Sequence, residues 1–364
     1  MCQYSATDGL VGDYHLVHLG RFALGGFGLV LVEATGVTAD GRISHGDVGI
    51  WSDEHVPGLA RVAAFLREHG SVPGIQLGHA GGRASTRRPW DGPGPVTPAN
   101  ARPGEEPWPT VSPSGVPMGA GWPEPHPMTV EEMAAVRDAF AAAARRALAA
   151  GFQVVEVHAA HGYLLNQFLS PLTNHREDGY GGSPENRMRF PLEVVAAVRA
   201  AWPQDLPLLV RVSAVDASLE GTTVEDTVAF ARELRSLGVD AVHVSGGGIG
   251  ARWEHPIGYG YQVPFAARIK DEAGIPTIAV GLIVDARQAE AVVADGGADL
   301  VAVAREAQDD PNFALHAARE LTRGSYDSYP VQAGPRLASR DRLFDRLGPW
   351  TGRDPVRIER PAQV

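Results

Sequence analysis

The chain is very poor in cysteine and lysine: among its 364 residues it has one of each, Cys2 and Lys270. A single cysteine excludes an internal disulfide, a four-cysteine zinc site and an iron–sulfur cluster held by this chain alone. Schiff-base chemistry would have to use Lys270, which stands inside the helical stretch AARIKDEAG, a poor place for it. Thiolate-held clusters and covalent lysine catalysis are therefore weak candidates.

Positive charge and long apolar runs are also scarce. The net charge of -11 argues against nucleic acid or an anionic membrane as the main partner. The sequence has no apolar run long enough to span a bilayer and no pattern of a secretory signal peptide. Because 44% of the residues are hydrophobic, a chain of this length can bury a large core. We expect an intracellular, cytoplasmic protein.

Short apolar runs rich in β-branched residues alternate with stretches of helical period. The runs lie at 28–34, 72–77, 153–158, 207–213, 239–246, 275–281 and 298–305. The helices are predicted at 13–25, 53–69, 129–150, 185–201, 223–237, 262–273, 285–295 and 309–323. The runs are apolar throughout, which is typical of a parallel sheet covered by helices.

Two architectures fit this repeat, the open doubly wound sheet and the (β/α)8 barrel. No G-x-G-x-x-G motif follows a strand, and the GGGIG stretch at 246–250 continues as a loop rather than into a helix. The barrel is therefore favoured. Seven runs and eight helices, beginning with a helix, leave one strand unaccounted for at the front. We predict an α/β fold, a (β/α)8 TIM barrel whose first strand is missing from this chain.

Two segments stand apart from the repeat. The stretch 79–128 is rich in proline, glycine and tryptophan, and it follows the run at 72–77. Loops at that end of a strand build the active sites of barrels, so we interpret 79–128 as an active-site flap. The predicted division is a barrel at 1–324 and a tail at 325–364 that packs on the barrel or on a neighbouring subunit. His15 and His18, on the first helix, are expected at its surface or end.

The carboxyl ends of barrel strands face one cavity, so the residues there are candidates for chemistry. They are Glu33 and Ala34, Gln76, His158, Arg211, Ser245 and Gly246, Gly281, and Arg305. The set lacks the carboxylate pair that glycoside hydrolysis needs. His158 and His161 come from one loop and no third metal ligand stands out, but a metal-dependent barrel hydrolase using both histidines stays open as an alternative.

The arginines at the strand ends indicate a bound anion. Arg305, with Gly281 on the preceding strand, matches the common phosphate site after strands 7 and 8 of a barrel. Gln76 offers a bidentate amide that suits the edge of a heterocycle, and Arg211 suits a second electron-rich group. Taken together, these residues favour a phosphorylated heterocyclic cofactor.

The segment HAAHGYLLNQFLSPLTNHREDGYGGSPENRMRF at 158–190 resembles the characteristic motif of the old yellow enzyme family of FMN-dependent ene-reductases. Further matching segments are MCQYS (1–5), VEATGVTADGRI (32–43), IWSDEH (50–55) and IQLGHAGGRAS (75–85). They are most similar to the bacterial branch with cysteine and tyrosine in the N-terminal motif. The resemblance implies FMN as cofactor, NADPH or NADH as reductant, small activated alkenes as substrates, and a homo-oligomer.

The resemblance also implies a role for each matched residue. His158 and His161 would donate hydrogen bonds to the carbonyl or nitro oxygen of an α,β-unsaturated substrate, whose β-carbon takes a hydride from flavin N5. Tyr163 would protonate the α-carbon, and Tyr4 would add a hydrogen bond to the substrate oxygen. Flavin contacts are implied for Cys2, Ala34, Gln76, Arg211, Gly281, Ala304 and Arg305, of which the last three hold the phosphate.

Two departures from the family pattern leave a further alternative. Ala304 stands where the family usually has glycine beside the phosphate. The family's first strand, whose end contacts flavin, has no counterpart before the first helix of this sequence. A truncated flavin-binding protein with little turnover is therefore a third hypothesis.

Overall fold

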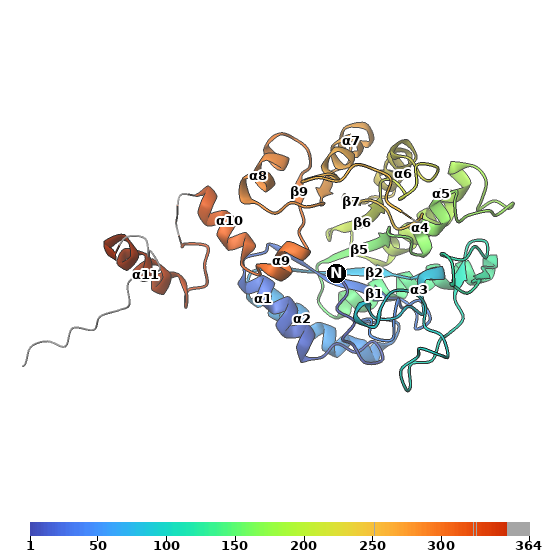
Figure 1. Cartoon of the computed structure of the whole chain (residues 1–364), viewed down its shortest axis with the longest axis horizontal. Helices are drawn as coiled ribbons and strands as arrows, with labels where there is room; N and C mark the ends of the chain where they lie inside the picture. Colours follow the sequence, from blue (N-terminus) through green and yellow to red (C-terminus); the bar gives the residue numbers. More distant parts are fainter. Residues whose placement is uncertain (251, 323, 325, 348–364) are drawn as a thin grey trace, which may run out of the picture.

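A curled parallel sheet forms the centre of the computed structural model, which describes residues 1–250, 252–322, 324 and 326–347 (Figure 1). The sheet has seven strands in the order β1-β2-β5-β6-β7-β8-β9. Their bounds are Leu29–Gly36, Val72–Gly78, Val154–Ala159, Leu208–Ser213, Ala241–Ser245, Thr277–Ala279 and Leu300–Val301. A second, two-stranded sheet joins β3 (Val111–Ser112) to β4 (His126–Pro127) inside the predicted flap. The predicted parallel βα architecture is thus confirmed.

Helices cover the outer face of this sheet (Figure 1). They are α1 (Asp13–Leu24), α2 (Val56–Glu68), α3 (Val130–Ala149), α4 (Leu164–Leu169), α5 (Pro184–Ala201), α6 (Val224–Ser236), α7 (Val263–Ala273), α8 (Ala286–Ala294), α9 (Arg305–Asp309) and α10 (Phe313–Leu321). A further helix, α11 (Gly334–Leu347), stands apart from the sheet. Local capping explains several starts: Thr129 accepts a hydrogen bond from the Glu132 amide, and the Glu132 carboxylate accepts one from the Thr129 amide. None of the helices in the described ranges is long and apolar enough to cross a membrane.

The helix predicted over 309–323 is present as α10 (Phe313–Leu321), but it begins later than predicted. A break at Asp310 and Pro311 separates it from the short helix α9. Proline has no amide hydrogen and disfavours the helical conformation in the residue before it, and Asp310 is accordingly extended, with φ -116° and ψ 92°. The strand predicted over 298–305 is observed only as β9 (Leu300–Val301), and α9 already begins at Arg305.

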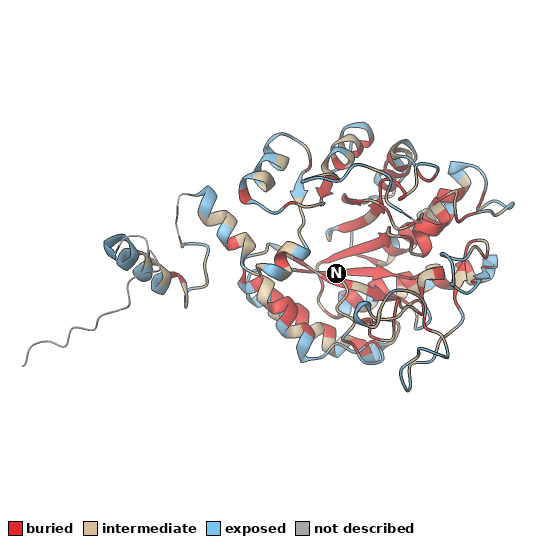
Figure 2. Cartoon of the chain, viewed as in Figure 1, coloured by how far each residue is buried: buried red, intermediate tan, exposed pale blue. Residues whose placement is uncertain are grey.

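The two faces of the sheet differ in chemistry. Residues such as Val155, Val210 and Val242 belong to the large core shared with the helices, and Figure 2 shows burial concentrated on the strands and on inward helix faces. A smaller cluster of Val154, Leu209, Ala241 and Ile278 lies on the opposite, concave face. Side chains alternate along a strand, so residues two and four positions further along point to the same concave face. Those positions are Glu156 and His158 on β5, Arg211 and Ser213 on β6, and His243 and Ser245 on β7.

The two histidines of α1, expected at its surface or end, are both buried, although His15 does stand at the helix start. His15 is 0% exposed and His18 is 8% exposed. His15 has a local capping role, because its Nδ1 accepts a hydrogen bond from the Gly12 amide at 3.2 Å. Burial lowers the pKa of His18 to about 4, with a contribution from Arg21, so this ring is neutral at physiological pH.

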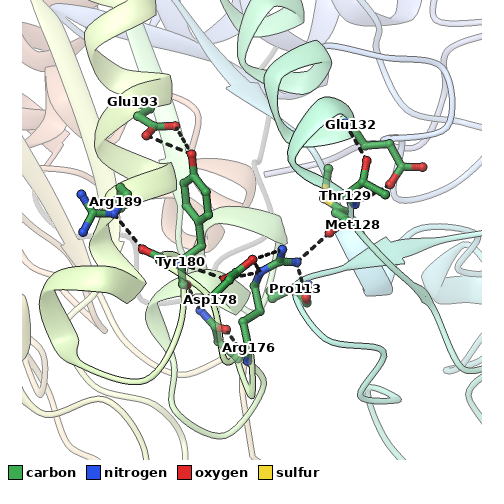
Figure 3. A network of polar contacts seen from close by, with 11 residues as sticks. Pro113, Met128, Thr129, Glu132, Arg176, Asp178, Tyr180, Arg189 and Glu193 are labelled. Carbon is green, nitrogen blue, oxygen red and sulfur yellow. Dashed lines mark hydrogen bonds and ion pairs between the residues drawn. The ribbon is translucent and has the colours of Figure 1, made fainter.

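Arg176 fastens the flap to the segment that follows α4. Its Nη1 donates to the carbonyl oxygens of Pro113 (2.9 Å) and Met128 (2.6 Å), next to β3 and β4 (Figure 3). Its Nε donates to Asp178 at 3.0 Å, which keeps the guanidinium oriented. The side chain of Arg176 is only 11% exposed, so water has limited access to replace it as the donor to the two carbonyl groups.

We predict that Arg176→Met loosens the flap, because two partly buried carbonyl groups lose their donor. The expected loss is about 2 kcal/mol in the free energy of unfolding, measured by urea denaturation, with faster proteolytic cleavage between 113 and 128. Arg189→Met is the matched control: Arg189 is exposed and donates to the Gly179 carbonyl in the same network. Equal effects of the two substitutions would contradict the role given to Arg176.

Candidate active site

His158, His161 and Tyr163 lie together where β5 ends and the chain turns toward α4. The ring of His158 stands edge-on to the rings of His161 and Tyr163, with centroid distances of 5.2 and 5.0 Å. His158 Nε2 and His161 Nδ1 are 3.4 Å apart. The structure therefore brings the three residues predicted as catalytic into one group.

The backbone of His161 is held in an uncommon conformation. Its φ is +60°, in the left-handed region that a non-glycine residue adopts only when its surroundings impose it. Its amide donates to Ser213 Oγ at 2.9 Å, and its carbonyl accepts from Arg83 Nη1 at 2.7 Å. Hydrogen bonds from β6 and from the flap thus fix the position of this imidazole.

Both imidazoles of the pair are neutral. Burial, followed by the positive charge of Arg211, lowers the pKa of His158 to about 3 and holds the pKa of His161 well below its usual value. The Ala160 amide donates to His158 Nδ1 at 3.2 Å, so the proton of the neutral His158 ring must sit on Nε2. That N–H points to the side on which His161 lies.

Tyr163 also belongs to an apolar cluster that contains the predicted N-terminal site residues. Around buried Ile43, Ala80 and Ala84 pack Cys2, Tyr4, Ala34, Tyr163 and Trp108. Burial raises the pKa values of Tyr163, Tyr4 and Cys2, so two phenols and a thiol stay protonated here. Sequence reasoning missed Trp108, which lies in the flap, where no periodic pattern marks a residue as buried.

The flap is fastened directly over this cluster. Arg88 pairs with Glu105 inside the flap, and its Nε donates to the Tyr4 carbonyl at 3.2 Å. Trp108 Nε1 donates to the carbonyl of Asp40 at 2.8 Å, in the loop that follows β1. The segment 79–128 therefore contacts the predicted site residues.

A buried carboxylate lies one layer below the histidines on the concave face. Glu156 is 0% exposed; its two oxygens accept hydrogen bonds from Gln76 Nε2 (2.6 Å) and His243 Nδ1 (2.7 Å). Strand register places Arg211 beside both His158 and His243. Burial alone would raise the pKa of Glu156, but His243, Arg211 and Gln76 outweigh it and lower the pKa to about 2.

Sequence reasoning missed Glu156 and His243, although one signal was present. Glu156 stands two residues before His158 in the run QVVEVH, and period-2 alternation puts both on one face. The partnership with His243 carries no such signal, because it depends on the register of three strands. The structure therefore adds an anionic group to a site whose predicted strand-end residues included two arginines.

Comparison with known proteins decides the family. The model of the NADH:flavin oxidoreductase / NADH oxidase family matches residues 1–323. The chain belongs to this family. The resemblance to old yellow enzymes and the prediction of a flavin oxidoreductase are thereby confirmed.

Relatives of this flavin oxidoreductase are similar over nearly their full length. The NADPH dehydrogenase of Geobacillus thermodenitrificans is 47% identical over 91% of this chain and 91% of its own. The NADPH dehydrogenase of Bacillus subtilis is 41% identical over 88% of this chain and 89% of its own. A solved structure of morphinone reductase matches with a TM-score of 0.72 and 27% identity, covering 89% of this chain and 84% of that one. The TIM-barrel prediction is confirmed.

The described residues of this family member fit a flavin ring. Arg211 Nε is buried and has no hydrogen-bond partner, so a donor remains for an acceptor on a bound group. Arg211 lies on the same concave face as Gln76 and His158. A guanidinium beside an amide suits the oxygen- and nitrogen-rich edge of the flavin ring.

The phosphate end expected for a flavin nucleotide falls at strands β8 and β9. Gly281 follows β8 with φ +109°, and a β-carbon there would come within 3.1 Å of the Gln262 side chain. Ala304 is the N-cap residue of α9, and both it and Arg305 are exposed. Exposed backbone at a helix start next to an arginine fits an anionic phosphate.

The metal-hydrolase alternative requires a third ligand beside His158 and His161. Within the described part of the chain, no three histidine, cysteine, aspartate or glutamate side chains are grouped so as to hold a metal ion. The neighbours of this pair are instead Tyr163, Ser245 and the backbone of the loop.

We predict that Glu156→Gln changes how stability depends on pH. A folded-state pKa below the usual 4.5 stabilises the protein above that pH, and this stabilisation is lost as the pH falls toward about 2. The wild-type advantage in the free energy of unfolding should be on the order of 2 kcal/mol near neutral pH and should shrink between about pH 5 and about pH 3. Urea denaturation measures it. Glu54→Gln, at an exposed carboxylate, is the control, and a wild-type advantage that stays constant with pH would refute the prediction.

Proposed function

We propose that the chain is an FMN-dependent reductase that uses NADPH or NADH to reduce the C=C bond of α,β-unsaturated carbonyl or nitro compounds. The observation that carries this is the group of two neutral imidazoles, with His158 Nε2 and His161 Nδ1 3.4 Å apart, beside the protonated phenol of Tyr163. Two neutral N–H donors suit a carbonyl or nitro oxygen, and a phenol suits protonation of a carbon close by. Membership of the flavin oxidoreductase family and the NADPH dehydrogenases among its relatives support the cofactor and the reductant.

The bound flavin would take a hydride from NAD(P)H and supply it to the β-carbon of the substrate. Gln76 and Arg211 would hold the flavin ring on the concave face, with Ala34 and Cys2 against it. Gly281, Ala304 and Arg305 would hold the phosphate.

His158 and His161 would bind the substrate oxygen and polarise the conjugated alkene. Hydrogen bonds aimed at an oxygen that gains negative charge strengthen as the reaction proceeds, and more so where water is excluded. The lowered pKa values of both histidines keep each ring a neutral donor, so no proton is lost to the product at this position. Tyr4 would add a third hydrogen bond to the same oxygen.

Tyr163 would donate its phenolic proton to the α-carbon. Its raised pKa ensures that the proton is present over the whole physiological range, and it makes the phenolate a transient state that must be reprotonated. The edge-on contact with His158 fixes the phenol relative to the oxygen-binding pair.

We also propose the division into a barrel at 1–324 and a tail at 325–364 that packs on a neighbouring subunit. Helix α11 stands apart from the barrel (Figure 1), and its Leu343, Phe344 and Leu347 are 53%, 55% and 79% exposed. Exposed apolar side chains of this kind on one helix suit an interface with another copy of the chain. The part of the tail at 348–364 lies outside the described residues.

Substituting Tyr163 separates the two halves of the proposed reaction. With Tyr163→Phe, bleaching of the flavin by NADPH should be unchanged, whereas reoxidation by 2-cyclohexen-1-one should slow about 10²–10⁴-fold because the proton donor is lost. Anaerobic stopped-flow absorbance measures both rates. Tyr14→Phe, at a tyrosine that is 52% exposed, is the control.

Three outcomes would count against the proposed function. A protein that is colourless and takes up no added FMN would exclude flavin catalysis by this chain. Flavin that is reduced by NADPH but not reoxidised by any activated alkene would favour a flavin-binding protein with little turnover. Stoichiometric zinc in metal analysis of the purified protein would favour the hydrolase.

A further inference from the structure

The ring of His161 has a second hydrogen-bond partner that the proposed reaction does not use. Its Nε2 lies 2.8 Å from the hydroxyl oxygen of Ser245, the last residue of β7. Ser245 is 5% exposed and belongs to the concave face, in register with Ser213 on β6. The two serines therefore approach the same histidine from neighbouring strands.

The two serines hold different parts of His161. Ser213 Oγ accepts from the His161 backbone amide at 2.9 Å and donates to the Gly247 carbonyl at 2.7 Å. The hydroxyl of Ser213 thus uses both its acceptor and its donor capacity on backbone groups. Ser245 contacts the imidazole ring, so its hydroxyl can affect which ring nitrogen carries the proton.

The position of that proton decides whether His161 can bind a substrate oxygen. His158 carries its proton on Nε2, because its Nδ1 accepts from the Ala160 amide. If His161 is protonated on Nε2, it donates to Ser245, and its Nδ1 accepts from His158 at 3.4 Å. In that case all four ring nitrogens of the two histidines have hydrogen-bond partners within the protein. If His161 is protonated on Nδ1 instead, its Nδ1–H and the Nε2–H of His158 point to the same place, where one oxygen can accept both hydrogen bonds.

We propose that Ser245 is a positioning residue that selects the Nδ1–H tautomer of His161 when a carbonyl or nitro oxygen enters the site. A hydroxyl can do this because it both accepts and donates: it accepts from Nε2–H in the free protein and donates to Nε2 in the complex. The imidazole stays neutral throughout, so no proton leaves the site. The inference rests on the proposed function, since it concerns the oxygen-binding pair of that reaction.

The direct test is the tautomer itself. Protein with 15N-labelled histidine and oxidised FMN is titrated with 2-cyclohexen-1-one, which cannot be reduced without NADPH, and His161→Gln assigns the signal. In wild type, the 15N shifts of His161 should change from the Nε2–H to the Nδ1–H pattern on saturation with the ketone. In Ser245→Ala they should keep a mixed pattern, because no donor remains for Nε2.

Binding and turnover provide the second readout. Loss of one hydrogen bond to the oxygen should weaken ketone binding by Ser245→Ala about tenfold and slow flavin reoxidation by at least as much, with flavin reduction by NADPH unchanged. Ser245→Thr keeps a hydroxyl and should restore both within about twofold of wild type. Ser236→Ala, at an exposed serine whose hydroxyl donates to the Glu233 carbonyl, is the control and should leave ketone binding and the tautomer response unchanged.

The results that would overturn the proposal are specific. They are an Nδ1–H pattern in the ketone complex of Ser245→Ala, ketone affinity equal to wild type in that variant, or failure of Ser245→Thr to restore it. If Ser245→Ala does not fold, Ser245→Cys replaces it, and a Cys variant that binds ketone as tightly as the Thr variant refutes the role of the hydroxyl. If wild type binds the ketone with the tautomer change but reduces no alkene, the proposed function fails while this inference stands.

Discussion

The pairing of buried charges on the concave face governs the chemistry of the strand ends. Arg211 is a permanent cation within the sheet, and a buried cation is tolerated only near a compensating charge. Glu156, two residues before the first catalytic candidate, supplies that charge, and Gln76 and His243 satisfy its oxygens. Because Arg211 therefore stays charged and close, it adds to burial in keeping His158 neutral. The donor character of the imidazoles thus depends in part on the charge of Arg211, which lies beside His158 in the strand register.

The concave face changes from apolar to polar along the strands. Its start is apolar, with Val154, Leu209 and Ala241 as a floor. Polar side chains come further along the strands: Glu156 lies level with Leu209 in the register, and Arg211 lies level with His158 and His243. Strand alternation puts these side chains on one face, since every second residue of a strand faces the same side, and the register of the three strands sets their order. Glu156, the buried carboxylate, is thus paired by side chains of neighbouring strands, and the titratable histidines lie nearer the strand ends.

The sequence predicted elements well and cross-strand partners poorly. Helices and strands follow from local period and capping, so most predicted bounds lie within a few residues of those observed. Pro311 delays the start of the helix predicted over 309–323, because proline keeps Asp310 out of the helical conformation. The burial of His15 and the contact of Glu156 with His243 depend on tertiary packing, which one sequence does not encode in any short period. The resemblance to old yellow enzymes supplied the histidine-loop roles that periodicity left open between metal ligation and hydrogen bonding.

The buried polar side chains of the sheet and the flap at 79–128 differ in how far they can change. The buried polar side chains of Glu156, Gln76 and His243 are hydrogen-bonded to one another, so changing Glu156 would leave the other two without a partner. The flap has no such constraint over most of its length, and it is fastened at a few points, by Arg88 to Tyr4 and by Arg176 to the segment after α4. Between those points it presents Trp108 to the cluster that holds Tyr4 and Tyr163. Changes in the flap between these points can therefore leave Glu156 and Arg211, and with them the neutral state of the histidines, unchanged.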